Sequence, residues 1–280
     1  MNTATSRYAL FLALTAALGG AACDIQVGEN GVSLDVAQST ARDEWRRTYT
    51  LAEGGRLEIS NRNGGIDVEP ASGREVVVVA ERRIRGGADE EAQAFLQALK
   101  MNEEIAPGRV RIEAQLPEDA GESRNAVITR NRVTIGYRIK VPPGLRLILS
   151  TGNGGVKLED VTGQIEASTT NGGIDAVDVS GSVKATAVNG GIRVEMRSMT
   201  GDVEVAVTNG GVRVELPLGA KATLDATCVN GGISVDDSLG LQASETSRRR
   251  VTGTLNGGGP KLLASTVNGG IRIEAVAPGD

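Results

Sequence analysis

The sequence predicts an all-β protein: a stacked, β-helix-like solenoid with short coils turned at Asn-Gly-Gly corners, and one helix in the N-terminal half. The tripeptide NGG recurs along the chain, about 20 residues apart over most of the array, as in a stacked repeat protein. After each corner, apolar and polar residues alternate, as in "GGVRVEL" and "GGIRIEA", which is typical of a half-buried strand. Aromatic residues make up only 2% of the chain, so Val, Ile, Leu and Ala must fill a thin core.

Residues 1–22 read as a signal peptide. A short polar start is followed by an apolar run and small residues in "RYALFLALTAALGGAAC"; the run is too short for a membrane-spanning helix. "LGGAAC" resembles a bacterial lipobox, although Gly20 stands where an aliphatic residue is usual. We therefore expect lipid attachment at Cys23. The alternative is ordinary cleavage, which leaves Cys23 as a plain N-terminal residue or as a disulfide partner for Cys228.

Residues 23–50 are polar and irregular, and we expect a tether that joins the fold near Trp45. Residues 51–150 form a β-rich N-terminal part. Its one amphipathic segment, "ADEEAQAFLQALKMN", predicts a helix over about 88–102. Residues 151–280 then form the repeat solenoid.

Each repeat reads as a strand, a Gly-containing turn, a second strand and an NGG corner. Asn and Gly both adopt left-handed backbone at low cost. Asn256 also aligns with the corners. The structural corner residues that we single out are Asn63, Asn153, Asn171, Asn189, Asn209, Asn230 and Asn268.

Two topologies fit this repeat, because Asn-Gly is also the strongest short signal for a β-hairpin. An antiparallel meander would need a cover for its apolar face, and one helix is too short for that. In a solenoid the two strands of each coil face one another and the coils stack, so the solenoid is favoured. Asn side chains would then lie above one another and could form a ladder.

The corners, the opening "GGRLEISNRNGGIDV", the entry "LRLILSTGNGGV" and the lipoprotein-like signal together resemble the bacterial putative-adhesin family of unknown function with β-strand repeats. The resemblance covers nearly the whole mature chain. It implies an extracytoplasmic β-solenoid with no established catalytic residues. The word adhesin in that name does not by itself establish adhesion.

The composition excludes several kinds of chemistry. The chain has no His, which removes His-based triads, His metal ligands and the usual proton shuttle at neutral pH. The net charge of −5 comes without a basic stripe, so we expect no nucleic-acid partner. Calcium-binding β-rolls carry Asp within their Gly-rich repeats, and that series is absent here, so we expect no metal, cofactor or catalytic residue.

Outward charges alternate along the strands, as at Arg193 and Glu195. They form either a recognition face or a solvated sheet surface. The longest gap between corners, 236–256, holds Asp236, Asp237, Glu245 and the run Arg248–Arg250. It is the candidate site for a carbohydrate-active enzyme, if two of its carboxylates line a pocket. Cys228 reads as a small buried residue.

These observations predict an exported, lipid-anchored protein of the bacterial envelope that faces the periplasm or the exterior. It would present a regular surface for binding, as an adhesin-like protein or a scaffold, to an envelope protein, a polysaccharide or another copy of itself. The alternatives are a carbohydrate-active enzyme that uses 236–256 and an envelope-stress sensor.

Overall fold

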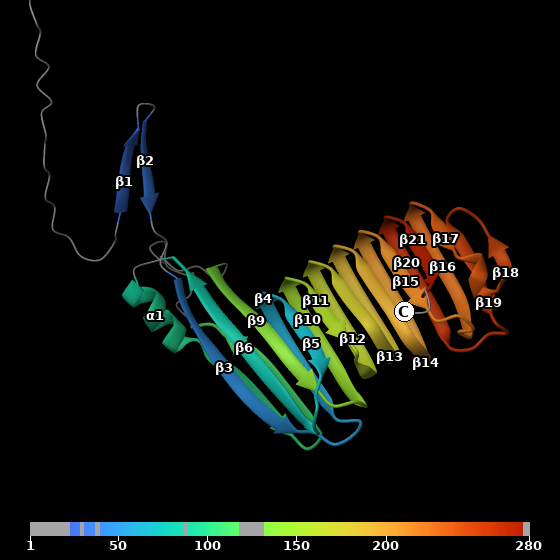
Figure 1. Cartoon of the computed structure of the whole chain (residues 1–280), viewed down its shortest axis with the longest axis horizontal. Coiled ribbons are helices and arrows are strands. Elements are labelled where there is room, and N and C mark those ends of the chain that lie inside the picture. Colours follow the sequence, from blue (N-terminus) through green and yellow to red (C-terminus); the bar gives the residue numbers. More distant parts are fainter. Residues whose placement is uncertain (1–22, 29–30, 37–39, 87–88, 118–131, 277–280) are drawn as a thin grey trace, which may run out of the picture.

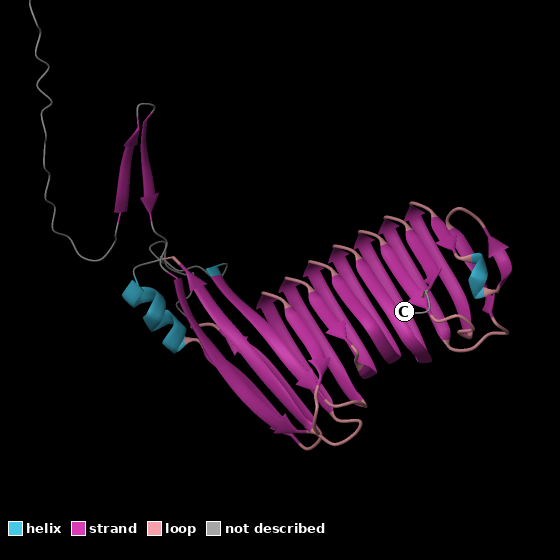
Figure 2. Ribbon diagram, viewed as in Figure 1, coloured by secondary structure: helices cyan, strands magenta, loops and turns pink. Residues whose placement is uncertain are grey.

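The computed structural model describes residues 23–28, 31–36, 40–86, 89–117 and 132–276. Nearly all the strands belong to one large curled sheet that winds into a solenoid (Figures 1 and 2). The predicted all-β solenoid with one α-helix is therefore confirmed. The predicted signal peptide, 1–22, lies outside the described residues. Among the described residues, no helix is both long enough and apolar enough to cross a membrane.

The solenoid has two faces, and each coil contributes one strand segment to each face. The strands that lead into an Asn-Gly corner make face A. In spatial order, face A consists of β4 (Arg56–Asn63), β10 (Leu145–Asn153), β12 (Thr162–Asn171), the second half of β13 (Ile174–Asn189), the second half of β14 (Ile192–Asn209), β20 (Lys261–Asn268) and β16 (Ala222–Asn230). The strands that leave a corner make face B. In the same order, face B consists of β5 (Ile66–Pro70), β11 (Val156–Glu159), the first halves of β13 and β14, β15 (Val212–Leu216), β21 (Ile271–Ala275) and β17 (Ile233–Val235).

All pairings within these two faces are parallel, and like residues stack on like. On face A, for example, Leu147 pairs with both Leu57 and Ile165. On face B, Ile192 pairs with both Ile174 and Val212. These side chains point inward and are almost fully buried. The core is therefore a set of aliphatic rows between the faces, which explains how a chain so poor in aromatic residues closes its interior.

The coils do not stack in chain order at the C-terminal end. The last coil, β20–β21, lies between the coil formed by β14 and β15 and the coil formed by β16 and β17. The simple reading of the repeat has successive segments winding one after another, and this reading is wrong at the final three coils. This change in the order of the coils preserves every parallel pairing, because each of these strands carries the same alternation of buried and exposed residues.

The N-terminal end is built from the strand that precedes β4 and from the insertion that separates β5 from β10. In the insertion, two strands, β8 (Arg109–Gln115) and β9 (Val133–Val141), continue faces A and B in parallel. Antiparallel strands then extend both faces: β7 (Lys100–Ala106) on face A, and β6 (Glu75–Arg85) followed by β3 (Thr40–Thr50) on face B. The first solenoid coil thus precedes residue 150, and one sheet runs through that position.

Two sequence expectations differ from the structure at this end. Helix α1 covers Asp89–Ala98 and packs on β3 and β6, whereas the expected helix ran over 88–102. Lys100–Asn102 instead begins β7, because these residues pair with β8. The expected tether, 23–50, contains a hairpin of β1 (Cys23–Gly28) and β2 (Gly31–Val36), and its last residues form β3. β3 is an edge strand with few buried residues, so its apolar alternation is weak.

The C-terminal end is closed by the residues between β17 and β20. They form a short 3₁₀ helix, η2 (Asp237–Leu239), and the antiparallel strands β18 (Leu241–Thr246) and β19 (Arg250–Leu255). β19 pairs with the last face A strand, β16, and β18 pairs with β19. Leu239, Val251 and Leu255 are buried there, so this segment caps the core.

Candidate functional site

The seven corner asparagines form a continuous ladder along one edge of the solenoid. In each step the side-chain Nδ2 of one Asn donates, at 2.7–2.9 Å, to the Oδ1 of its neighbour on the side of Asn63. The order along the edge is Asn63, Asn153, Asn171, Asn189, Asn209, Asn268 and Asn230. Asn256 lies outside the ladder and donates to the carbonyls of Ala220 and Leu239 in the C-terminal cap. The ladder keeps the corners in register, and it uses the side-chain amides of these asparagines for hydrogen bonds to one another.

The first glycine of each corner is required by the close approach of neighbouring coils. Gly190 has a φ of 147°, and a Cβ at this position would lie 2.0 Å from the carbonyl oxygen of Gly172. The second glycine is different: a Cβ on Gly211 would meet its nearest atom, the carbonyl oxygen of Gly270, at an ordinary 3.6 Å. At Gly211 the missing side chain leaves open space at the surface, whereas a Cβ on Gly173 would lie a tighter 3.1 Å from the carbonyl oxygen of Gly191.

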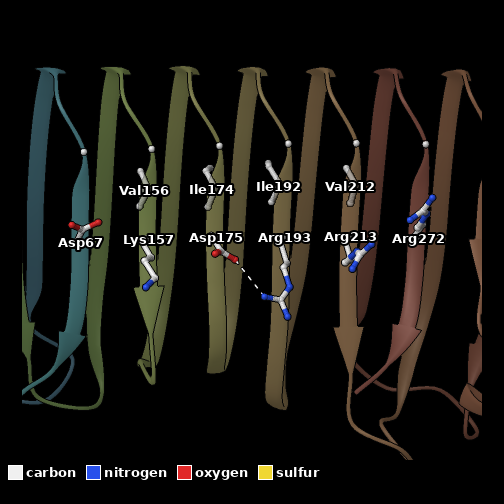
Figure 3. A pocket seen from close by; sticks show the side chains of 16 residues that line it. Asp67, Val156, Lys157, Ile174, Asp175, Ile192, Arg193, Val212, Arg213 and Arg272 are labelled. Atoms are coloured by element: carbon white, nitrogen blue, oxygen red, sulfur yellow. Dashed lines mark ion pairs between the residues drawn. The ribbon is translucent and has the colours of Figure 1, made fainter. Parts of the chain in front are cut away.

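The second glycines line a long, shallow groove of about 800 Å³ that runs beside the corners on face B. The stripe of glycine backbone spans six adjacent coils. A row of charged side chains borders it, one from each coil, and Figure 3 shows them side by side. In spatial order this groove row is Asp67, Lys157, Asp175, Arg193, Arg213 and Arg272. The row is mixed in charge at one end and carries three consecutive arginines at the other.

Arg193 is the most connected member of the groove row. Its guanidinium donates to both carboxylate oxygens of Glu215, at 3.2 and 2.7 Å, and to Glu195 at 2.7 Å. Asp175 lies 4.0 Å away (Figure 3). The hydrogen bond from Arg193 holds the pKa of Glu215 below its usual range. Burial has the larger effect on Glu195 and raises its pKa, although Arg193 opposes that shift.

The two arginines beyond Arg193 in the groove row form longer ion pairs, or none, within the described part of the chain. Arg213 contacts Glu215 and Glu274, each at 3.7 Å. Arg272 is exposed and forms no ion pair with any residue that the structure describes. Its donors are therefore available to an anionic or hydrogen-bonding group that enters this end of the groove.

The enzyme alternative receives no support from the 236–256 segment. The Asp236 side chain accepts a hydrogen bond from the backbone nitrogen of Ser238 and caps η2. Glu245 and Asp225 both pair with Arg250, at 3.5 and 3.1 Å. These carboxylates are used for structure, and the groove on face B is lined by other residues. Within the described ranges, no three acidic or cysteine side chains gather as a metal site.

The two cysteines lie in different parts of the fold. Cys228 is buried and free, in the core position two residues before a corner Asn, with its thiol 3.7 Å from the carbonyl of Arg248. In three other coils the equivalent position holds Thr151, Thr169 or Thr266, whose hydroxyls donate to corner carbonyls. Cys23 is the first residue of β1.

Sequence reasoning did not identify the groove. Its signal was present, since the second glycine is followed two residues later by a charged or polar residue in every coil. The spatial run of Arg193, Arg213 and Arg272 was hidden, however, because Ser234 stands between Arg213 and Arg272 in chain order. Only the insertion of the last coil brings the three arginines together.

The protein is a β-solenoid whose exposed surfaces, including the groove, repeat from coil to coil. A family model for Toastrack DUF4097 matches residues 124–274, more than half of the chain, and the protein belongs to this family. Residues 40–117, which hold the first coil, α1 and strands β3, β6, β7 and β8, lie outside that match.

The chain is similar to several solved structures. A putative cell adhesion protein from Clostridium sporogenes is 13% identical, covers 84% of this chain and 100% of its own, and superposes with a TM-score of 0.50. A putative adhesin from Bacteroides fragilis is 10% identical, covers 84% of this chain and 97% of its own, and gives a TM-score of 0.31. No curated protein matches the chain. At this level of identity, the first of these likenesses establishes the fold.

Proposed function

We propose that the protein is a non-enzymatic, adhesin-like component of the bacterial cell envelope that binds a partner along its groove. The observation that carries the proposal is the groove itself: a continuous stripe of glycine backbone, bordered by one charged side chain per coil and ending at the exposed Arg272. A rigid stack of strands supports it, so little ordering is needed on binding.

The groove suits an extended partner with repeating polar groups. Neighbouring strands are spaced by about 4.8 Å, so successive charges in the groove row recur at that interval. An extended polysaccharide or a protein segment presents groups along its length in a comparable way. The names given to the similar solved structures agree with a binding role and with none in catalysis.

A binding experiment on two single variants tests this proposal, and each variant adds one phenylalanine ring at a different place. Gly211→Phe places the ring in the groove, where a Cβ is tolerated, and Thr186→Phe places the same ring on exposed face A. The ligands are isolated wall polysaccharide and intact cells. We expect saturable binding that Gly211→Phe weakens at least tenfold and Thr186→Phe leaves unchanged. Absence of binding, or equal binding by both variants, would contradict the proposal.

We further propose that the protein is exported and held at the membrane by a lipid on Cys23. The lipobox-like "LGGAAC" supports this. Mass spectrometry of membrane fractions should find a diacylated cysteine in the wild type, while Cys23→Ser should move the protein to the soluble fraction. An unmodified, soluble wild-type protein would remove the anchor and leave the groove proposal intact.

A further inference from the structure

Strand β3 has an open edge at the N-terminal end of the solenoid. It pairs along its 11 residues with β6, and none of the described strands pairs with its other side. Helix α1 packs on β3 and β6. An unpaired edge of this length is a ready template for another strand, and native proteins usually cover or blunt it.

Three charged side chains of β3 lie on its outward face. Arg42, Glu44 and Arg46 point outward, and none forms an ion pair with any described residue. The pKa of the Glu81 carboxyl of β6 is lowered, mainly by a hydrogen bond within that strand, and Arg42 lies near it and contributes to the lowering. Glu44, however, lies opposite Glu81, and Arg46 lies opposite the uncharged Val79. Like charges directly opposite one another are destabilising. Glu44 and Arg46 therefore lack the favourable contacts that a further strand would supply.

The sequence of β3 is complementary to itself. We propose that β3 pairs antiparallel with β3 of a second copy, about a twofold axis through Trp45, and joins two solenoids end to end. In this register, residues at equal distances on either side of Trp45 face each other. Glu44 faces Arg46 of the second copy, and Arg46 faces its Glu44, so the axis generates two such pairs.

The alternatives in register are excluded by charge. If the two cores are to face the same side, each outward residue of one β3 must pair with an outward residue of the other, and each inward residue with an inward one. A step of the register therefore moves each residue to the next partner on the same face of the strand. One step in one direction places Glu44 against Glu44 of the second copy. One step in the other places Arg46 against Arg46. Only the register centred on Trp45 brings opposite charges together without a like pair.

The inward residues fit the same arrangement. Trp45, the only tryptophan of the chain, is partly buried and lies under the guanidinium of Arg47, 5.0 Å from the ring centroid. On the twofold axis it would meet Trp45 of the second copy, and aromatic cross-strand pairs stabilise sheets. Asp43 and Arg47 already hold Arg82 and Glu103, so the outer pair of Glu44 and Arg46 provides the specificity.

The test uses charge reversal in the full chain carrying Cys23→Ser, so that no lipid can attach. Sedimentation measures the oligomeric state across protein concentration, and Trp45 fluorescence reports on the proposed contact itself. We expect a concentration-dependent dimer whose formation shifts the tryptophan emission to shorter wavelength. The single variants Glu44→Arg and Arg46→Glu each place like charges across the axis. Both should be monomeric at concentrations where the unreversed chain is dimeric.

Two experiments that restore opposite charges across the axis distinguish loss of the β3 contact from unfolding. The double variant Glu44→Arg/Arg46→Glu restores opposite pairs and should dimerise again. An equimolar mixture of the two single variants should form a heterodimer, because the arginines of one chain then face the glutamates of the other. A monomeric unreversed chain, dimers that persist in the single variants, or restoration in neither case would overturn the proposal. None of these outcomes depends on the groove.

Discussion

At the scale of single residues, the corner explains most of the composition. Asn supplies a side chain that both donates and accepts, so a corner Asn inside the ladder bonds to the coil on either side. The first Gly allows the coils to approach, and the second leaves the groove open. The sequence predicted the corner and its turn chemistry. It could not show that the two glycines have different roles, because that difference depends on the distance to the neighbouring coil.

The two glycines should respond differently to the same small substitution. Gly190→Ala forces a side chain into backbone with φ 147° and against the Gly172 carbonyl. It should lower the free energy of unfolding by at least about 2 kcal/mol, because strain and a steric clash add. Gly211→Ala, one corner further on, should change it by less than about 0.5 kcal/mol. Urea denaturation measures both values, and equal effects would contradict the assignment.

The carboxylates around Arg193 predict a pH dependence. The pKa of Glu215 is lowered in the folded state, so the stability that it contributes is present above its unfolded pKa and is lost as the pH falls through the folded one. Arg193→Met should therefore cost about 1 kcal/mol at pH 7, and the difference from wild type should shrink below pH of about 4.

The matched control for this pH profile is Arg146→Met on face A. Arg146 lies 3.9 Å from Glu166, and both side chains are about half exposed. Its effect at pH 7 should be smaller than that of Arg193→Met. A difference between Arg193→Met and wild type that stays constant from pH 7 to pH 3 would show that the pairing with Glu215 does not carry the contribution.

At the scale of elements, strands with strict alternation were predictable and edge elements were not. The repeat strands bury every second residue against an aliphatic row, so period two is visible in the sequence. β3 and β7 lie at the open end and bury little. Their tertiary pairings with β6 and β8 decide their conformation. For the same reason, the helix that was expected to reach residue 102 ends at Ala98.

The position of each element in the stack predicts its local stability. Amides of β12 and the second half of β13 bond to strands on both sides and lie over buried rows. β18 is mostly exposed and, among the described strands, pairs with β19 alone. In hydrogen exchange, the central strands should be protected close to the global free energy of unfolding, and β18 should exchange fastest among the repeat-region strands. Uniform protection along the chain would contradict a stack that opens from its end.

At the scale of the whole molecule, the solenoid class was predictable, but the order of its coils was not. All the final coils carry the same corner and the same alternation, so the sequence does not distinguish which of them are neighbours. The structure places β20 between β14 and β16. This order produces the arginine end of the groove, so the candidate site depends on a feature of topology that no local pattern encodes.

The order of the coils is therefore the claim to test, and engineered disulfides test it most directly. Ala206 and Ser265 are Cα partners on adjacent parallel strands of face A, and Ser265 separates Ala206 from Thr227. Adjacent strands lie within the reach of a disulfide, but strands two apart do not. All variants carry Cys23→Ser and Cys228→Ala, and mass spectrometry measures the intramolecular cross-link under mild oxidation. The account predicts that Ala206→Cys/Ser265→Cys forms the bond and that Ala206→Cys/Thr227→Cys does not; the reverse result would contradict it.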